Sequence, residues 1–474
     1  TNPFSNLKQK TSYFLKNYIR GKKKIEIFNR TKNKFNILNE VNKHFKKDRL
    51  KKNIKLHFVD HHKSHIASAF YPSKFNKAIG LSIDGFGDFS SLAIAKCENS
   101  NIKIIERVYF PHSLGVFYEA FTQLLGFTNY GDEYKVMGLS SYGSPIYYNE
   151  ILSDFFKEEK SINLNLKYFQ HIGKNFSYKF KGSPNQSILF NHKVFAKFSI
   201  TKNKKITMKH MNIASSAQKV FEYKILNIIK KINKLKFSKN LIYAGGCALN
   251  SLANKKIIDS NIFKKIFIPY APGDGGGSIG SALVVANKKY NFKKFKNLSS
   301  PYIGPRYEVD EIYNFIKQNK HLKKFKIKKY TNAGNFTDHI AKYIFQNKII
   351  GYFNDRMEFG ARALGNRSII ANPCNPKIKK IINLKIKRRE NFRPFAPAII
   401  EEEKKKWFGN DRHNYYMSSV ESIIPKKQKL IPAVTHIDGT GRVQTVSKET
   451  NLNFYTIIKK FKKLSGVPII LNTS

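Results

Sequence analysis

The sequence predicts a mixed α/β protein built from two domains. Three observations support this class: short apolar strands alternate with helical segments, glycine-rich loops follow several of these strands, and an irregular stretch interrupts the chain near residue 300. At 474 residues the chain is long enough to bury two or three hydrophobic cores. We therefore expect a first domain over residues 1–298 and a second over residues 299–474.

Each element is expected from its local pattern. The first fifty residues are polar and basic, and we expect them to be largely helical. In the first domain, apolar runs predict strands at 56–59, 78–83, 91–95, 240–244 and 266–270. Helical spacing predicts helices at 61–70, within 113–140, at 213–232 and from about Ser278. In the second domain the same criteria predict helices at 308–318 and 335–346, and strands at 349–353 and 467–472.

Composition narrows the functional classes. The chain has 86 basic and 32 acidic residues, a net charge of +54, which invites a nucleic-acid interpretation. Most basic residues are lysines spread along the whole chain, and Ile, Asn, Phe and Tyr are also abundant. Biased codon usage explains this composition, so we favour a solvated lysine-rich surface over a dedicated nucleic-acid surface. Three scattered cysteines and no apolar run of membrane-spanning length fit a cytoplasmic protein.

Arginines carry more information than lysines in this chain. Only arginine offers a planar fork that binds phosphate or carboxylate at two points. Seven of the 13 arginines lie in three short segments of the second domain, next to glycine and proline residues. We interpret these segments as a rigid site for several anionic groups. The seven are Arg356, Arg362, Arg367, Arg388, Arg389, Arg393 and Arg442.

The first domain carries a candidate metal and nucleotide site. His61 and His65 are four residues apart, so on a helix they share a face and can hold one metal ion. Three glycine loops each follow a predicted strand, and together they suggest an actin-like nucleotide fold. Asp84 and Asp274 lie in two of these loops; either can complete the metal site, and Asp274 is preferred because glycines surround it. The remaining candidate nucleotide-binding residues are Gly85, Gly245, Gly246, Asn250, Gly273 and Gly275.

These motifs together resemble the O-carbamoyltransferases, the family of nodulation-factor and antibiotic carbamoyltransferases. The resemblance rests on the run from Arg356 to Ser368, the block 391–397, the segment at Arg442 and the terminal Leu471-Asn472-Thr473-Ser474, together with the loops described above. It implies an actin-like first domain and a YrdC-like second domain. It also implies that ATP and carbamoyl phosphate are substrates, that carbamoyl-adenylate is the intermediate, and that a small-molecule hydroxyl is the acceptor. The family's first strand and final stretch have no counterpart here, so a fragment lacking both natural ends is expected.

The resemblance assigns roles residue by residue. His61, His65 and Asp274 match metal ligands, with Fe²⁺ expected there and Mg²⁺ accompanying ATP. Arg362, Arg393, Arg442 and Lys387 match the groups that hold carbamoyl phosphate and the adenylate. Ser474, Arg367 and Ser368 are expected beside them. Glu358 is expected to pair with an arginine, and His62 is a candidate acceptor base for which a packing role is favoured.

Two other classes stay open at this point. The chain could be a tRNA threonylcarbamoyl transferase, which the positive charge would suit, although the arginine-rich second domain argues against it. It could also be a non-enzymatic binder of nucleic acid or anionic surfaces, which would show steeply salt-dependent binding. The identity of the acceptor and the presence of a homodimer are left open by the sequence.

Overall fold

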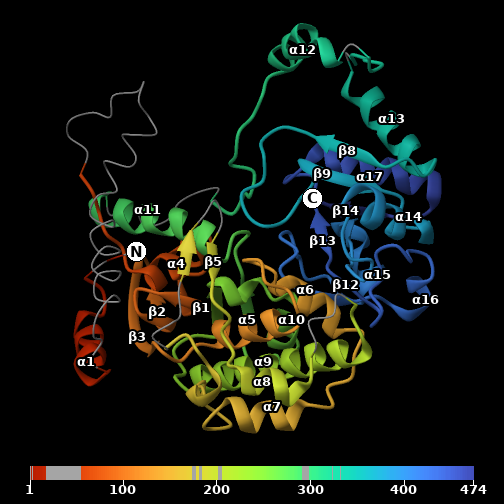
Figure 1. Ribbon diagram of the computed structural model, residues 1–474. Helices are drawn as coiled ribbons and strands as arrows, with labels where there is room; N and C mark the ends of the chain where they lie inside the picture. Colours follow the sequence, from red (N-terminus) through yellow and green to blue (C-terminus); the bar gives the residue numbers. More distant parts are fainter. Residues whose placement is uncertain are drawn as a thin grey trace.

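The computed structural model describes residues 2, 4–17, 55–172, 178–180, 184–200, 205–290, 298–322, 324–330 and 332–474. Its two five-stranded sheets confirm the mixed α/β class. One sheet lies within residues 77–267 and the other within residues 350–473, and in Figure 1 the two halves lie side by side. The predicted division at residue 298 falls between helices α11 (Asp274–Tyr290) and α12 (Val309–Gln318).

The first sheet has the order β3-β2-β1-β6-β7. Strands β1 (Lys77–Gly87), β2 (Ser90–Glu98) and β3 (Asn101–Tyr109) are antiparallel neighbours, whereas β6 (Asn240–Ala244) and β7 (Lys265–Phe267) run parallel to β1. Successive side chains of β1 point to opposite faces of the sheet. Both sets are buried, which fits the central position of the strand. Ile79, Leu81 and Ile83 are fully buried in one core, and Ala78 is buried in another on the opposite face.

Helices cover both faces of this sheet (Figure 1). Helix α4 (His61–Phe70) packs with α11 on the face of Ala78, where Ile66, Phe70 and Leu283 are buried. Helices α5 (Leu114–Leu124) and α9 (Met208–Asn233) cover the other face with a phenylalanine-rich core. The same half also contains α1 (Leu7–Asn17), α6 (Glu133–Ser140), α7 (Tyr148–Phe155), α8 (His192–Phe198), α10 (Ser251–Asp259), β4 (Tyr178–Phe180) and β5 (Pro184–Gln186).

The second sheet has the order β13-β10-β14-β9-β8, and its neighbours are antiparallel except for β10 and β13. Helices α13 (Ala333–Phe345) and α17 (Leu452–Ser465) pack against it through Ile344, Phe454 and Phe461. The strands are β8 (Ile350–Phe353), β9 (Arg367–Ala371), β10 (Ala396–Ile400), β13 (Gln444–Val446) and β14 (Ile469–Thr473). Shorter elements are α14 (Pro376–Ile381), α15 (Lys404–Phe408), α16 (Pro425–Gln428), β11 (Glu421–Ser422) and β12 (Thr440–Gly441).

Most predicted elements are present, with two differences. The expected strand at 56–59 is wrong: this segment is unpaired and leads directly into α4. Helix α11 begins at Asp274 and not near Ser278, because the three glycines that were expected to form a loop belong to its first turn. Of the helical expectation for the first fifty residues, α1 is present and 18–50 lie outside the described residues. Across the part of the chain that the structure describes, no helix is both long and apolar enough for a membrane span.

Candidate functional site

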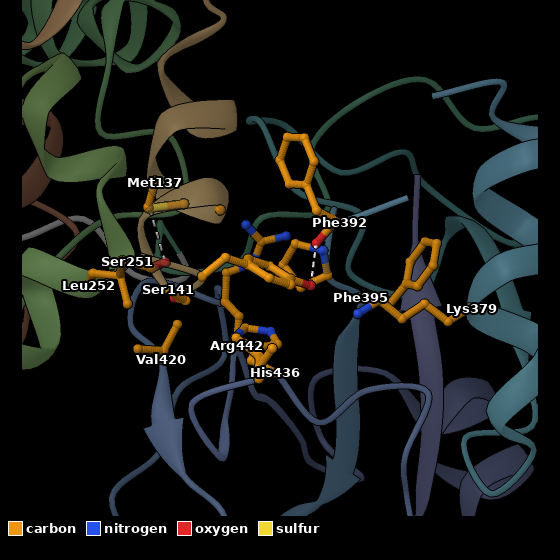
Figure 2. Close-up of a pocket in the computed structure, with 14 residues that line it drawn as sticks. Met137, Ser141, Ser251, Leu252, Lys379, Phe392, Phe395, Val420, His436 and Arg442 are labelled. Atoms are coloured by element: carbon orange, nitrogen blue, oxygen red, sulfur yellow. Dashed lines mark hydrogen bonds between the residues drawn. The ribbon is translucent and has the colours of Figure 1, made fainter. Parts of the chain in front are cut away.

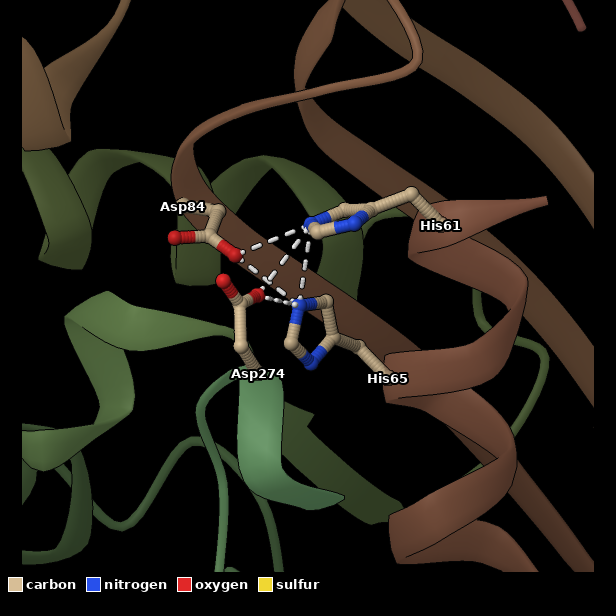
Figure 3. Close-up of side chains that lie close together, drawn as sticks. All are labelled: His61, His65, Asp84 and Asp274. Carbon is tan, nitrogen blue, oxygen red and sulfur yellow. Dashed lines mark hydrogen bonds and ion pairs between the residues drawn. The ribbon is translucent and has the colours of Figure 1, made fainter. Parts of the chain in front are cut away.

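Two histidines and two aspartates converge beside β1, the central strand of the first sheet (Figure 3). His61 and His65 project from the first turns of α4, Asp84 from β1 and Asp274 from the start of α11. The two Nε2 atoms lie 3.0 Å apart, and Asp84 Oδ2 lies 3.1 Å from His61 Nε2 and 2.8 Å from His65 Nε2. Asp274 Oδ1 lies 3.4 Å from His65 Nε2. One ligand atom from each residue falls within a common span of 4.8 Å.

Local structure explains why these side chains meet. Asp60 caps α4 by accepting a hydrogen bond from the backbone N–H of Lys63 at 2.9 Å, which fixes where the helix begins. Gly87 leaves room for the His61 ring, because a Cβ there would lie 1.9 Å from His61 Cδ2. Gly280 lets α11 approach α4 closely, since its Cβ would lie 1.8 Å from the Ser64 carbonyl oxygen. The close approach brings Asp274 to the histidines.

The electrostatics of the cluster favour a cation. Burial alone lowers the pKa of His65, but the carboxylates of Asp274 and Asp84 outweigh it and raise that pKa to about 9. Burial opposes ionisation of Asp84, yet hydrogen bonds with His61 and His65 hold its pKa well below the usual range. Two imidazole nitrogens and two carboxylates around one point form a donor set that suits a divalent transition metal. The residues present therefore fit a metal centre.

A cavity of about 780 Å³ extends from this cluster to the second sheet. Its walls come from both halves of the chain: Asp84 and Gly246 contribute from the first, and Arg362, Arg393 and Arg442 from the second. Segments far apart in the sequence meet here, because Ser474, directly after β14, lines the same cavity as Asp84. Nine of the predicted site residues line it, namely Asp84, Gly85, Gly246, Asn250, Arg362, Lys387, Arg393, Arg442 and Ser474.

The second-domain wall of this cavity is strongly electropositive. Burial lowers the pKa of Arg362 to about 10, and its Nη2 donates to the Leu249 carbonyl at 3.2 Å. Burial lowers the pKa of Arg442, with a further contribution from the nearby guanidinium groups, and its buried Nε has no hydrogen-bond partner among the described residues. Burial, Arg389 and Arg393 together lower the pKa of Lys387 to about 8. Cations that depress one another's pKa values in this way are stabilised by a bound anion.

Arg389 also lines the cavity, although the sequence analysis assigns it no role beyond membership of the arginine cluster. Its Nε donates to Asn383 Oδ1 at 2.7 Å, which holds the side chain in place, and within the described part of the chain its buried Nη2 has no partner. Asn383 is fully buried and belongs to a short π-helical turn at 382–386. The signal was present in the sequence, because Arg389 belongs to the arginine cluster and lies two residues after Lys387.

Several other predicted residues lie apart from the cavity wall. Arg367 donates to the carbonyl oxygens of Asn354, Asn366, Asp355 and Pro305, and its guanidinium stacks 3.5 Å from the Phe353 ring centroid. The guanidinium N–H groups of Arg367 are thus bonded to backbone carbonyls of the protein itself. The buried Ser368 accepts a hydrogen bond from the Gly365 N–H. Neither lines the cavity, nor do Gly245, Gly273 and Gly275, of which Gly275 lies in the first turn of α11. Of the histidine–aspartate cluster, only Asp84 lines it.

Two neighbouring residues have packing roles. His62 is fully buried and hydrogen-bonds Ser82 Oγ at 2.8 Å and the Ser90 carbonyl at 3.0 Å, which supports packing over a role as acceptor base. The expectation that Glu358 pairs with an arginine side chain is wrong. Its Oε1 instead accepts hydrogen bonds from the backbone N–H groups of Leu364, Asn366 and Arg367.

A cavity that borders the histidine–aspartate cluster at Asp84 and is lined by partly buried arginines is the candidate active site of a two-part α/β enzyme with anionic substrates. Comparison with known proteins identifies the family. Residues 5–283 match the family described as Carbamoyltransferase N-terminus, and residues 341–474 match Carbamoyltransferase C-terminus. The chain therefore belongs to the carbamoyltransferase family and is a transferase.

The chain is also similar to several individual proteins. An uncharacterized protein of Synechocystis is 34% identical, with 88% of this chain and 70% of that protein covered. Nodulation protein NolNO of Sinorhizobium fredii is 32% identical, with 89% of this chain and 59% of NolNO covered. Nodulation protein NolO of Bradyrhizobium diazoefficiens is also 32% identical, with coverages of 88% and 72%. Among solved structures, HypF of T. kodakarensis matches with a TM-score of 0.27 and 16% identity, over 52% of this chain and 38% of HypF.

Proposed function

We propose that this protein is an O-carbamoyltransferase that makes carbamoyl-adenylate from carbamoyl phosphate and ATP and transfers the carbamoyl group to a small-molecule hydroxyl. The observation that carries the proposal is the continuous cavity, which is lined by cations of the second half of the chain and by Asp84 of the histidine–aspartate cluster. A shared cavity allows an activated intermediate to form and react without release into solvent. Family membership supports the carbamoyl group as the one transferred.

The first reaction requires charge neutralisation. Water hydrolyses carbamoyl phosphate to carbamate and inorganic phosphate, and a carbamate oxygen then attacks the α-phosphorus of ATP and displaces pyrophosphate. Negative charge gathers on the phosphoryl oxygens in both steps. In this proposal Arg362, Arg393 and Arg442, with Lys387, bind those oxygens, and the partly buried setting of the cavity wall strengthens each interaction. Ser474 lines the same wall and supplies a hydroxyl for a further hydrogen bond.

The second reaction moves the carbamoyl group to the acceptor. The acceptor oxygen attacks the carbamoyl carbon, and AMP leaves with the electrons of the broken C–O bond. His61, His65, Asp84 and Asp274 would hold the proposed Fe²⁺, which when bound supplies Lewis-acid polarisation beside this step. Mg²⁺ is proposed to accompany ATP. The two glycine segments that contain Gly85 and Gly246 leave backbone groups accessible for the nucleotide.

The first reaction can be tested by pyrophosphate release from ATP, measured with and without carbamoyl phosphate. We expect release that requires carbamoyl phosphate and that falls about 100- to 1,000-fold in Arg362→Ala, as for the loss of one transition-state donor. Arg306→Ala is the matched control, because Arg306 is half exposed and pairs with Glu308 and Asp355 away from the cavity. Equal release with and without carbamoyl phosphate would refute the proposal.

A further inference from the structure

Helix α6 belongs to the first half of the chain but faces the arginine segment of the second. Its first two residues, Glu133 and Tyr134, line the large cavity together with Arg389 and Arg393. Farther along, Met137 and Ser141 border a small adjoining pocket of about 30 Å³ (Figure 2). Phe392, His436 and Arg442 form the opposite wall of that pocket. One short helix therefore borders both spaces.

Tyr134 makes the most direct contact with an anion-site side chain. The guanidinium carbon of Arg393 lies 4.3 Å from the centroid of the Tyr134 ring, within the range of a cation–π interaction. The only carboxylate that the structure pairs with Arg393, among the described residues, is Glu390, at 3.5 Å from Nη1. The Tyr134 ring and the Glu390 carboxylate therefore both orient the guanidinium of Arg393, which lines the cavity.

The backbone that carries Arg393 is also held by this helix region. Lys135 Nζ lies 3.5 Å from Glu390 Oε1 and 2.9 Å from Asp132 Oδ1, so it ties the arginine segment to the start of α6. The Tyr142 hydroxyl, just after α6, donates to the Phe392 carbonyl at 3.1 Å. Both contacts hold the short segment that directly precedes Arg393.

We infer that Tyr134 is a positioning residue for anion binding: its ring, presented by α6 of the first half, fixes Arg393 of the second half in the orientation that grips phosphate. This inference rests on the anion site of the proposed function. It means that the two halves do not merely share a cavity. The first half completes the phosphate-binding site of the second.

The expected effect is modest and specific to anion affinity. Loss of the ring frees the Arg393 guanidinium to adopt other rotamers, which must be reordered when an anion binds. We expect Tyr134→Leu to weaken binding about fivefold, which corresponds to about 1 kcal/mol. Tyr134→Phe keeps the ring face and should bind within about twofold of the unaltered protein.

The test is equilibrium binding of inorganic pyrophosphate to the full-length protein by titration calorimetry, with thermal unfolding measured on each variant. Tyr343→Leu is the matched control, since Tyr343 is exposed on α13 and does not line the cavity. Weaker binding by Tyr134→Leu alone, at unchanged unfolding temperature, would support the inference. Unchanged affinity in Tyr134→Leu, equal losses in both Tyr134 variants, or no binding by the unaltered protein would each overturn it. Because this assay involves no turnover, failure of the carbamoyl reaction would be recognised separately by pyrophosphate release.

Discussion

Substituting Gly280 by alanine should separate the two helices that build the histidine–aspartate cluster. A Cβ at Gly280 would lie 1.8 Å from the Ser64 carbonyl oxygen and 2.9 Å from the Ser68 nitrogen, two atoms that α4 pairs in its own hydrogen-bond ladder. Neither can yield without distorting α4, so α11 must move away. Overpacking of this kind costs about 1–3 kcal/mol in the free energy of unfolding.

The same displacement should weaken the metal site. Asp274 belongs to α11, and its Oδ1 now lies 3.4 Å from His65 Nε2 on α4. Movement of α11 would lengthen that distance and remove one carboxylate from the common centre. We expect Gly280→Ala to bind Fe²⁺ at least tenfold more weakly, since loss of well-oriented ligation typically costs 10- to 100-fold in metal affinity.

Gly277 provides the control within the same helix. A Cβ at Gly277 meets no atom within 4 Å, so Gly277→Ala should stabilise α11 by roughly 0.5–1 kcal/mol through its better helix propensity. Urea unfolding and anaerobic Fe²⁺ titration would be measured on both variants. If Gly280→Ala matched the unaltered protein in stability and affinity, close helix contact would not be what holds Asp274 in place.

Two further predictions follow from buried polar groups. Glu358→Leu should lower the free energy of unfolding by about 2 kcal/mol or more, because it leaves three backbone N–H groups without their acceptor; a midpoint unchanged in urea would contradict this. Burial and two neighbouring arginines lower the pKa of Lys387 to about 8, and an anion favours its protonated form. Pyrophosphate affinity should therefore fall as pH rises through about 8, and Lys387→Met should remove that component; an identical pH profile in the variant would refute the assignment.

Local sequence patterns determined several parts of this protein. The four-residue spacing of His61 and His65 places both rings on one side of α4, since helix geometry alone decides which residues share a face. The run Asn240–Ala244 forms β6 with the predicted bounds, because an apolar segment followed by two glycines has few other ways to be buried. Four of the seven clustered arginines line the cavity, namely Arg362, Arg389, Arg393 and Arg442. Their clustering is informative in this chain because lysine does not offer the planar guanidinium of arginine.

Long-range packing decided the rest. Arg362 and Arg367 are five residues apart and chemically identical, yet one lines the cavity while the other binds backbone carbonyls. Between them the chain reverses at Gly365, whose φ of 101° is open chiefly to glycine, and no local spacing predicts which side faces the cavity. Likewise, Asp84 joins the histidine–aspartate cluster beside Asp274 because β1 and α11 both pack against α4. Spacing along a helix is a local property, whereas a cavity wall is defined by contacts between residues hundreds of positions apart.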